Sequence, residues 1–456
     1  MASGRMRVFL LLVADLACVY GSLALSLWGY WAIGLGHYRQ GFDLYLSLWP
    51  IGLAFVSLNT IFRLYHGNPL YPAAPVSQVE ELRRLIGSAL LTHAGVIAVL
   101  AFSRQTTEGY SRAALAISGI LVAVLAQPVR DLVRVLAKKS ALGQIPVVLA
   151  GTGVAADRLR TSLAHDAYTG FDVIRVFPDD RHEIVPVSRE LGVKILLACQ
   201  DERVLRCQLE DYTSWFTFVE YLPTADAFPI AGAQPVLFDG VGGLEMVNLR
   251  RMGAMRLEKS LLDWSLSALA FVLALPLFAL IPILIKLTSR GPVFYRAPRL
   301  GKSGRPIQVW KFRSMYADAD KRLDSLLAGN PQLKAEFEAN FKLANDPRVT
   351  PLGRFLRKTS LDEIPQLFNV FSGEMALIGP RPIVEREVAH YGRAYSIFSS
   401  VKPGITGLWQ ATGRSDTDYV RRVALDTHYV LNWSLWLDVW ILFRTVSAVL
   451  FMKGAR

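Results

Sequence analysis

Hydrophobic residues gather into four long runs in the first third of the chain, with polar segments between them. The runs cover residues 8–31, 44–64, 85–102 and 113–129. About 20 mainly apolar residues form a helix long enough to cross the ~30 Å hydrocarbon core of a bilayer. We therefore expect residues 1–140 to form a membrane α-helical bundle of four spans.

Basic residues lie mainly on one side of this predicted bundle. One side has nine: Arg5, Arg7, Arg63, Arg83, Arg84, Arg130, Arg134, Lys138 and Lys139. The other has three: Arg39, Arg104 and Arg112. Because cytoplasmic loops carry the excess of Lys and Arg, the amino terminus and everything after the fourth helix should be cytoplasmic. An acid within a span is either functional or satisfied inside the bundle, and we expect Asp15 to be satisfied there.

A glycine-rich turn follows the bundle. A predicted strand at 145–150 runs into Gly151-Thr152-Gly153 and a helical stretch, and further strands are expected at 171–177 and 194–199. With Asp179 and Asp180 closing the second strand, this is typical of a dinucleotide-binding first turn. We expect a cytoplasmic Rossmann-like α/β domain over 141–250. The same glycines serve any tight strand-to-helix turn, so cofactor binding and a regulatory or assembly role both stay open.

A fifth apolar run, residues 261–287, contains Pro276 in its middle and Pro282 after it. Proline removes a helical hydrogen bond and kinks the helix. Basic residues lie on both sides of the run: Arg250, Arg251, Arg256 and Lys259 before it, and Lys286, Arg290, Arg296, Arg299 and Lys302 after it. Both ends are then expected to be cytoplasmic, which predicts a re-entrant helix. A plain fifth span would instead put the remaining residues outside the cell.

Composition agrees with a membrane protein that has sizeable polar parts. The 456 residues are 52% hydrophobic, with a mean hydropathy of +0.30. The net charge of +12 indicates an anionic partner, and the flanking of apolar runs by basic residues favours lipid headgroups and phosphates. We find no nucleic-acid-binding motif. Cys18, Cys199 and Cys207 have neither disulfide-framework nor zinc spacing, and no cleaved signal peptide is expected.

Two adjacent acids, Asp362 and Glu363, precede an apolar helical pattern. Ser360-x-x-Glu363 fits a capping box, which is a purely structural explanation. A cap needs only one acid, however, and three basic residues lie just upstream: Arg354, Arg357 and Lys358. Cations at a helix amino end bind phosphate, and a carboxylate there can be a nucleophile or a ligand for a hard metal ion.

The polar part of the chain contains further cations but no His or Cys constellation. Lys311 and Arg313 follow a predicted strand at 307–310, and Arg381 lies between two prolines. Acids with cations favour phosphoryl transfer, in which Mg²⁺, Arg and Lys neutralise phosphate charge. The re-entrant segment indicates that one substrate lies in the membrane. A nucleotide-activated group from the cytoplasm as donor and a lipid phosphate as acceptor would suit both halves of the protein.

Four motifs in residues 256–456 resemble the signature of the bacterial sugar transferases, the monotopic polyprenyl-phosphate phosphoglycosyl transferases. They are KFRSM at 311–315, RKTSLDEIPQLFNV at 357–370, LIGPRP at 377–382 and KPGITGLWQATGR at 402–414. The predicted bundle and α/β domain are similar to those of the large members. The resemblance implies an α+β monotopic catalytic domain over 251–456, whose re-entrant helix turns at Pro276.

The resemblance also implies a reaction. Asp362 matches the nucleophile, which takes hexose phosphate from a UDP-hexose, releases UMP and passes the sugar phosphate to undecaprenyl phosphate. Glu363 matches its partner, and both acids are implied Mg²⁺ ligands. The implied phosphate- and nucleotide-binding residues are Lys311, Arg313, Arg357, Arg381 and Arg414. Galactose is favoured as the hexose, with glucose as the alternative, and assembly into a homodimer is left open.

Two other functions were weighed. A membrane-bound nucleotide-sugar dehydratase would need a second Gly-rich turn and a Tyr-x-x-x-Lys pair, and no Tyr of this sequence has a Lys four residues later. A non-enzymatic membrane scaffold would not need the Asp362-Glu363 pair with its arginines. Both fit the residues less well than a transferase of surface polysaccharide synthesis.

Overall fold

The computed structural model divides the chain into two compact units, Met1–Pro229 and Ile230–Arg456. It describes residues 2–32, 48–66, 76–102, 111–178, 183–222, 233–238, 241–246, 253–316, 319, 346–412 and 419–450. Asp179, Asp180 and Arg414 lie outside these residues.

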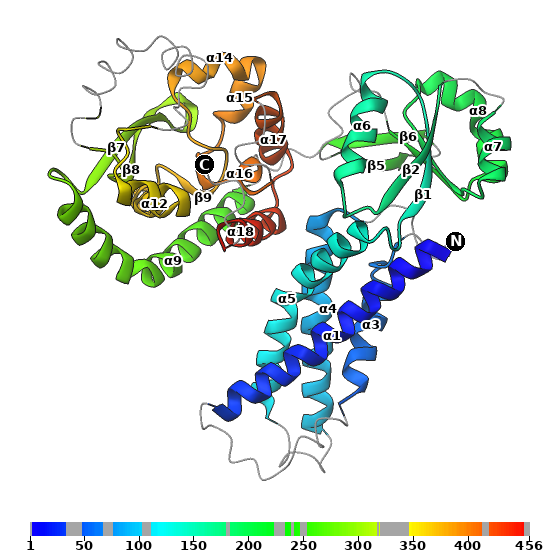
Figure 1. The fold of residues 1–456 in the computed structure, drawn as a ribbon, viewed down its shortest axis with the longest axis horizontal. Helices are drawn as coiled ribbons and strands as arrows, with labels where there is room; N and C mark the ends of the chain where they lie inside the picture. Colours follow the sequence, from blue (N-terminus) through cyan, green and yellow to red (C-terminus); the bar gives the residue numbers. More distant parts are fainter. Residues whose placement is uncertain are drawn as a thin grey trace. The chain divides into compact units, whose positions relative to one another are not determined.

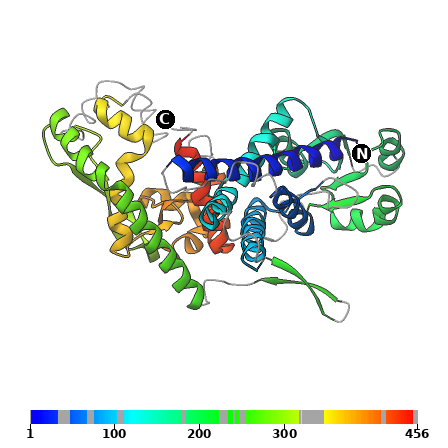
Figure 2. The ribbon, with the colours of Figure 1, turned by 90° about the horizontal axis from the view of Figure 1, so that it is seen from below.

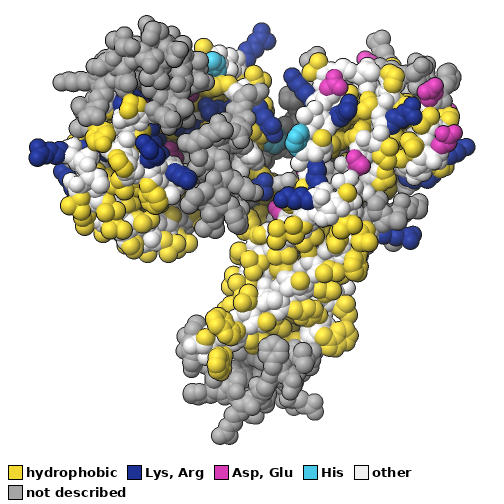
Figure 3. Space-filling view, in the orientation of Figure 1, with side chains coloured by type: hydrophobic (Ala, Val, Ile, Leu, Met, Phe, Trp, Pro, Cys, Tyr) yellow, Lys and Arg dark blue, Asp and Glu magenta, His cyan; other side chains and the backbone are white. Residues whose placement is uncertain are grey.

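Four helices begin the first unit (Figure 1): α1 (Ala2–Ala32), α3 (Pro50–Ile61), α4 (Gln78–Phe102) and α5 (Arg112–Lys139). Three of them, α1, α4 and α5, are long and apolar enough to cross a membrane, so the helices expected at the first, third and fourth apolar runs are present. Helix α3 has 12 residues, about 18 Å, and the first residues of the predicted run 44–64 lie outside the described part. On the face shown in Figure 3, hydrophobic side chains cover most of this bundle.

Charged residues inside the bundle pair with one another. Arg130 is fully buried, and its Nε donates to Asp15 at 2.8 Å while its Nη1 donates to Glu81 at 2.8 Å. Asp15 also accepts hydrogen bonds from Tyr65 (2.6 Å) and Asn59 (3.1 Å). The expectation that Asp15 is satisfied inside the bundle is confirmed.

A four-stranded parallel sheet completes the first unit, with strand order β2-β1-β3-β4. Its elements are β1 (Ile145–Ala150), α6 (Val154–His165), β2 (Phe171–Phe177), α7 (Ile184–Glu190), β3 (Ile195–Ala198), α8 (Glu202–Trp215) and β4 (Phe218–Tyr221). Helix α6 covers one face, and α7 with α8 covers the other. The three predicted strands are present. Gly151 has a positive φ of +126°, and a Cβ there would lie 2.2 Å from the Cys199 carbonyl oxygen, so close packing alone requires this glycine.

The second unit begins with an antiparallel ribbon (Figure 2) and the long helix α9. The ribbon strands are β5 (Ala233–Phe238) and β6 (Val241–Met246). The sequence analysis included these residues in the α/β domain over 141–250, whereas the structure places them in the second unit. Helix α9 (Gly253–Thr288) contains Pro276 and Pro282 and is visibly bent (Figure 1). One face packs Phe271 and Phe278 against the rest of the unit, and large apolar side chains remain exposed along the helix.

Short elements make up the remainder of this unit. They are β7 (Phe294–Leu300), η2 (Lys302–Gly304), β8 (Pro306–Phe312), α12 (Pro351–Thr359), η3 (Leu361–Gln366), α13 (Leu367–Phe371), β9 (Ala376–Ile378), η4 (Glu385–Glu387), α14 (Val388–Tyr391), η5 (Gly392–Ala394), α15 (Tyr395–Phe398), β10 (Gly404–Thr406), α16 (Leu408–Thr412), α17 (Tyr419–Leu431) and α18 (Leu435–Leu450). Strands β7 and β8 pair antiparallel, and β9 and β10 pair parallel.

Lys259 connects two of these elements, β9 and α18, to α9. Its Nζ donates to Asp263 on the same helix (2.8 Å), to Asp438 on α18 (2.8 Å) and to the carbonyl oxygen of Ile378 on β9 (2.9 Å). Tyr429 on α17 donates to the same Asp438, which is fully buried, at 2.8 Å. This cluster therefore fixes β9 and the loop after it to the apolar helix.

Replacing Arg130 by Met should destabilise the first unit strongly, because Asp15 and Glu81 would remain buried without their shared cation. Removing one partner of a buried ion pair typically costs roughly 3–5 kcal/mol. We expect a clear fall in the unfolding temperature of the full-length protein in detergent. Arg83→Met is the matched control, since Arg83 is exposed and lies 3.5 Å from Glu80. Equal unfolding temperatures for the two variants would contradict this role of Arg130.

Candidate active site

The segment that carries Asp362 and Glu363 is a sharp connection between two short helices. Thr350 caps α12, accepting a hydrogen bond from the Gly353 amide at 2.8 Å, and Ser360 ends the helix in a left-handed conformation (φ 58°). Both acids then lie in the first turn of the 3₁₀ helix η3. The predicted capping box is wrong, because the Ser360 side chain makes no cap hydrogen bond. Ser360 instead serves as the turn that separates α12 from η3.

Asn369 holds this segment against strand β8. Its Oδ1 accepts from the Trp310 amide at 2.9 Å, and its Nδ2 donates to the Gln308 carbonyl oxygen at 2.7 Å. The side chain is fully buried. This pins α13 to β8, and Lys311 at the end of β8 then reaches Glu363 Oε1 at 2.6 Å.

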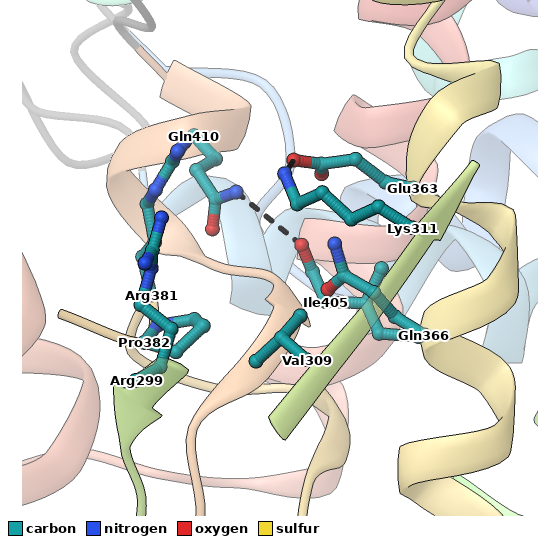
Figure 4. Close-up of a pocket in the computed structure, with 9 residues that line it drawn as sticks. All are labelled: Arg299, Val309, Lys311, Glu363, Gln366, Arg381, Pro382, Ile405 and Gln410. Carbon is teal, nitrogen blue, oxygen red and sulfur yellow. Dashed lines mark hydrogen bonds and ion pairs between the residues drawn. The ribbon is translucent and has the colours of Figure 1, made fainter. Parts of the chain in front are cut away.

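Nine residues line a pocket beside this ion pair (Figure 4): Arg299, Val309, Lys311, Glu363, Gln366, Arg381, Pro382, Ile405 and Gln410. They come from β7, β8, η3, the loop after β9, β10 and α16. Gln410 is oriented by a hydrogen bond to the Ile405 carbonyl oxygen at 3.3 Å. The pocket thus has one anion and three cations among its lining residues, an arrangement suited to a phosphorylated ligand.

The electrostatics of the site separate the two acids. Asp362 is 7% exposed and is not among the nine lining residues. Burial raises the pKa of Asp362 to about 6, and the nearby charge of Glu363 adds to this, while Lys311 and Arg357 oppose it. Burial also lowers the pKa of Arg299, and the charge of Arg381 lowers it further. Two neighbouring guanidinium groups would both gain from a bound anion.

The structure brings some predicted site residues together and leaves others apart. Lys311, Glu363 and Arg381 line one pocket. Arg313 donates to the Ser289 carbonyl oxygen (2.8 Å) and hydroxyl (2.7 Å) just beyond α9, and Arg357 donates to the Ser314 hydroxyl at 2.9 Å. Neither arginine lines the pocket, so their binding roles stay predictions, as does that of Arg414.

Sequence reasoning missed three polar lining residues, Arg299, Gln366 and Gln410, and three apolar ones, Val309, Pro382 and Ile405. Gln366 and Gln410 lie inside the motifs at 357–370 and 402–414, and Arg299 was considered only as one of the basic residues that flank α9. For Gln366 and Gln410, the available signal was that they lie inside the motifs. What the sequence could not supply is the pairing of β7 with β8, which places Arg299 opposite Ile307 at the base of the pocket.

Magnesium binding by Asp362 and Glu363 stays a prediction. No group of three or more His, Cys, Asp or Glu side chains close enough to bind a metal occurs in the described part of the chain. Mg²⁺ is commonly bound through one or two carboxylates, with substrate phosphates and water supplying the other ligands, so two adjacent acids are sufficient.

Comparison with known proteins identifies the family. The family model described as "Bacterial sugar transferase" matches residues 254–452. The undecaprenyl-phosphate galactose phosphotransferase of Salmonella typhimurium is 33% identical over 82% of this chain and 82% of its own length. The UDP-glucose:undecaprenyl-phosphate glucose-1-phosphate transferase of Escherichia coli is 33% identical over 68% of each chain.

A shorter relative is similar to less than half of this chain. The exopolysaccharide production protein ExoY of Rhizobium meliloti is 44% identical over 45% of this chain, which is 91% of its own length. Two of these relatives are 33% identical over more than two thirds of this chain and of their own length, which shows that the protein belongs to the bacterial sugar transferase family.

Proposed function

We propose that the protein transfers hexose 1-phosphate from a UDP-hexose to undecaprenyl phosphate and releases UMP, in the first membrane step of surface polysaccharide synthesis. The observation that carries this proposal is the pocket lined by Lys311, Arg299, Arg381 and Glu363, whose neighbour in the chain, Asp362, is buried. Relatives named as galactose and glucose phosphate transferases support it. Galactose is the proposed hexose and glucose the alternative.

Asp362 is the proposed nucleophile. A carboxylate oxygen of Asp362 attacks the β-phosphorus of the donor, the bond from that phosphorus to the bridging oxygen breaks, and UMP leaves with the electron pair. The phosphate oxygen of undecaprenyl phosphate then attacks the same phosphorus, which frees Asp362. Lys311, Arg299 and Arg381 neutralise the phosphate charge during both steps. Mg²⁺ held by Asp362 and Glu363 would add to that neutralisation.

Helix α9 is proposed to enter and leave the same side of the membrane. Its 36 residues correspond to about 54 Å, more than the ~30 Å of the hydrocarbon core, and the helix, which contains Pro276 and Pro282, is bent (Figure 1). Basic residues at both ends support a cytoplasmic location of both. The catalytic residues and the sheet of the first unit, proposed to be Rossmann-like, would then lie in the cytoplasm.

Asp362→Asn should abolish sugar phosphate transfer while leaving donor binding and the fold intact, because the amide oxygen is a poor nucleophile. The assay uses the full-length protein with Mg²⁺, undecaprenyl phosphate and a panel of UDP-sugars, and separates UMP from UDP. We expect UMP from the unsubstituted protein with one hexose, and no product from the variant. Turnover by Asp362→Asn would remove Asp362 as nucleophile. Release of UDP in place of UMP would replace this function with ordinary glycosyl transfer.

The pH dependence of the first step should follow the ionisation of Asp362. Only the carboxylate attacks, and its pKa is about 6 without metal, above the ordinary value. Bound Mg²⁺ would lower this pKa, so the rate should rise with pH to a midpoint at or below about 6. Lys311→Met removes a cation that lowers this pKa, and the midpoint should move to higher pH. Single-turnover UMP release between pH 5 and 8 measures it. A midpoint unmoved in Lys311→Met would show that another group controls the step.

Pro276→Ala should straighten α9 and reduce activity. Proline in a helix interior removes a hydrogen bond and clashes with the preceding turn, so its loss favours a straight helix. Labelling of single cysteines introduced at each end of α9, with a membrane-impermeant reagent, reports which side each end occupies. We expect both ends to be cytoplasmic in the unsubstituted protein, with Pro282→Ala as the matched comparison. Labelling of the two ends from opposite sides would refute the re-entrant arrangement.

A further inference from the structure

The pocket wall around Arg381 continues into a stack of side chains that the proposed chemistry does not use. The guanidinium carbon of Arg381 lies 5.8 Å from the ring centroid of Trp409, and that of Arg422 lies 4.0 Å from it. At these distances a guanidinium group is attracted to an indole ring. Trp409 is 4% exposed and directly precedes the lining residue Gln410. It therefore links the pocket cation Arg381 to Arg422 on helix α17.

Asp426 lies one helical turn after Arg422 and is fully buried. One carboxyl oxygen accepts a hydrogen bond from Tyr391 on α14 at 2.8 Å. The other, Oδ1, is buried and has no hydrogen-bond partner among the described residues. A buried carboxyl group that is only half satisfied is expensive, and such groups call for an explanation beyond packing.

Burial raises the pKa of Asp426 to about 7, although the Tyr391 hydrogen bond and the charges of Arg422 and Arg381 lower it. Asp426 thus changes charge near neutral pH within electrostatic reach of the pocket. The other groups facing this region are Tyr419, in contact with Arg422 and with the His390 ring, and Glu387, 3.8 Å from Arg422. Burial raises the pKa values of Tyr391 and Tyr419, so both phenols stay protonated.

We propose that Asp426 is a positioning residue for donor binding, whose charge, acting through Arg422, Trp409 and Arg381, sets how strongly the pocket holds the donor diphosphate. This inference rests on the proposed function, because it takes a UDP-hexose as the ligand of Arg381. The ionised carboxylate competes with the donor phosphates for the positive charge of Arg381, whereas the protonated carboxyl leaves that charge to the donor. Donor binding therefore takes up protons near neutral pH, by linkage.

The test measures the dissociation constant of UDP-galactose, and of UDP-glucose, by calorimetry between pH 6 and 8.5 at constant Mg²⁺. The full-length protein carries Asp362→Asn, which prevents the covalent step and removes the titration of Asp362. Both donor phosphates are diesters and do not ionise near neutral pH. We expect the dissociation constant to rise about threefold to tenfold with pH, which corresponds to a shift of roughly half to one pKa unit in Asp426 on binding.

Three further substitutions in this background separate positioning from simple structural support. Asp426→Asn keeps the shape of the side chain without its charge, so the dissociation constant should stay at the low-pH value at every pH. Tyr391→Phe removes a hydrogen bond that lowers the pKa of Asp426, so the midpoint should move to higher pH. Tyr395→Phe is the matched control, since Tyr395 also packs on Phe398, and its profile should be unchanged.

The outcomes distinguish this inference from the proposed function. If Asp426→Asn retains the pH dependence, or if Tyr391→Phe leaves the midpoint in place, Asp426 does not act on the donor and the inference is wrong while the transferase function stands. If neither the Asp362→Asn protein nor the unsubstituted protein binds any UDP-hexose at any pH, the proposed function itself fails. Proton uptake on binding, measured at pH 7 in buffers of different ionisation heat, must also disappear in Asp426→Asn.

Discussion

The ammonium group of Lys259 is the contact on which the arrangement of the second unit depends. It donates hydrogen bonds to carboxylates on α9 and α18 and to a carbonyl oxygen on β9, so that these three elements meet at one nitrogen. A buried carboxylate such as Asp438 is tolerated only with charged and hydrogen-bonding partners, and Lys259, Tyr429 and Trp433 supply them. The loop that carries Arg381 begins directly after β9, so the position of β9 also sets the position of this loop.

The same requirement shapes the bundle of the first unit. Asp15, Glu81, Arg130 and Arg134 are all buried, and each has an oppositely charged partner within hydrogen-bond distance. Two acids and two arginines leave the cluster without net charge, which a low-dielectric interior favours. In both units, therefore, charges in apolar surroundings hold helices together by mutual neutralisation.

The pocket departs from this rule, and the departure indicates its function. Glu363 neutralises Lys311, but Arg299 and Arg381 lie close together and Asp362 is buried with a raised pKa. Unbalanced cations next to an acid that ionises with difficulty are costly for stability and useful for binding phosphate. Asp426, half satisfied behind the Trp409 stack, extends this imbalance away from the pocket. The part of the unit that we propose to bind and transfer phosphate is the part whose charges are least neutralised by one another.

The sequence by itself determined the elements whose signal is local. Apolar length predicted α1, α4 and α5, the glycine turn predicted β1 with α6, and the motifs predicted Lys311, Glu363 and Arg381, which meet in one pocket. Tertiary structure decided the remaining features of the site, because these features depend on contacts between residues far apart in the chain. Ser360 became a left-handed turn instead of a cap, Arg313 turned to Ser289, and Arg299, Gln366 and Gln410 joined the pocket. The burial of Asp362 and Asp426, which controls their pKa values, is likewise a property of packing and is absent from any local pattern.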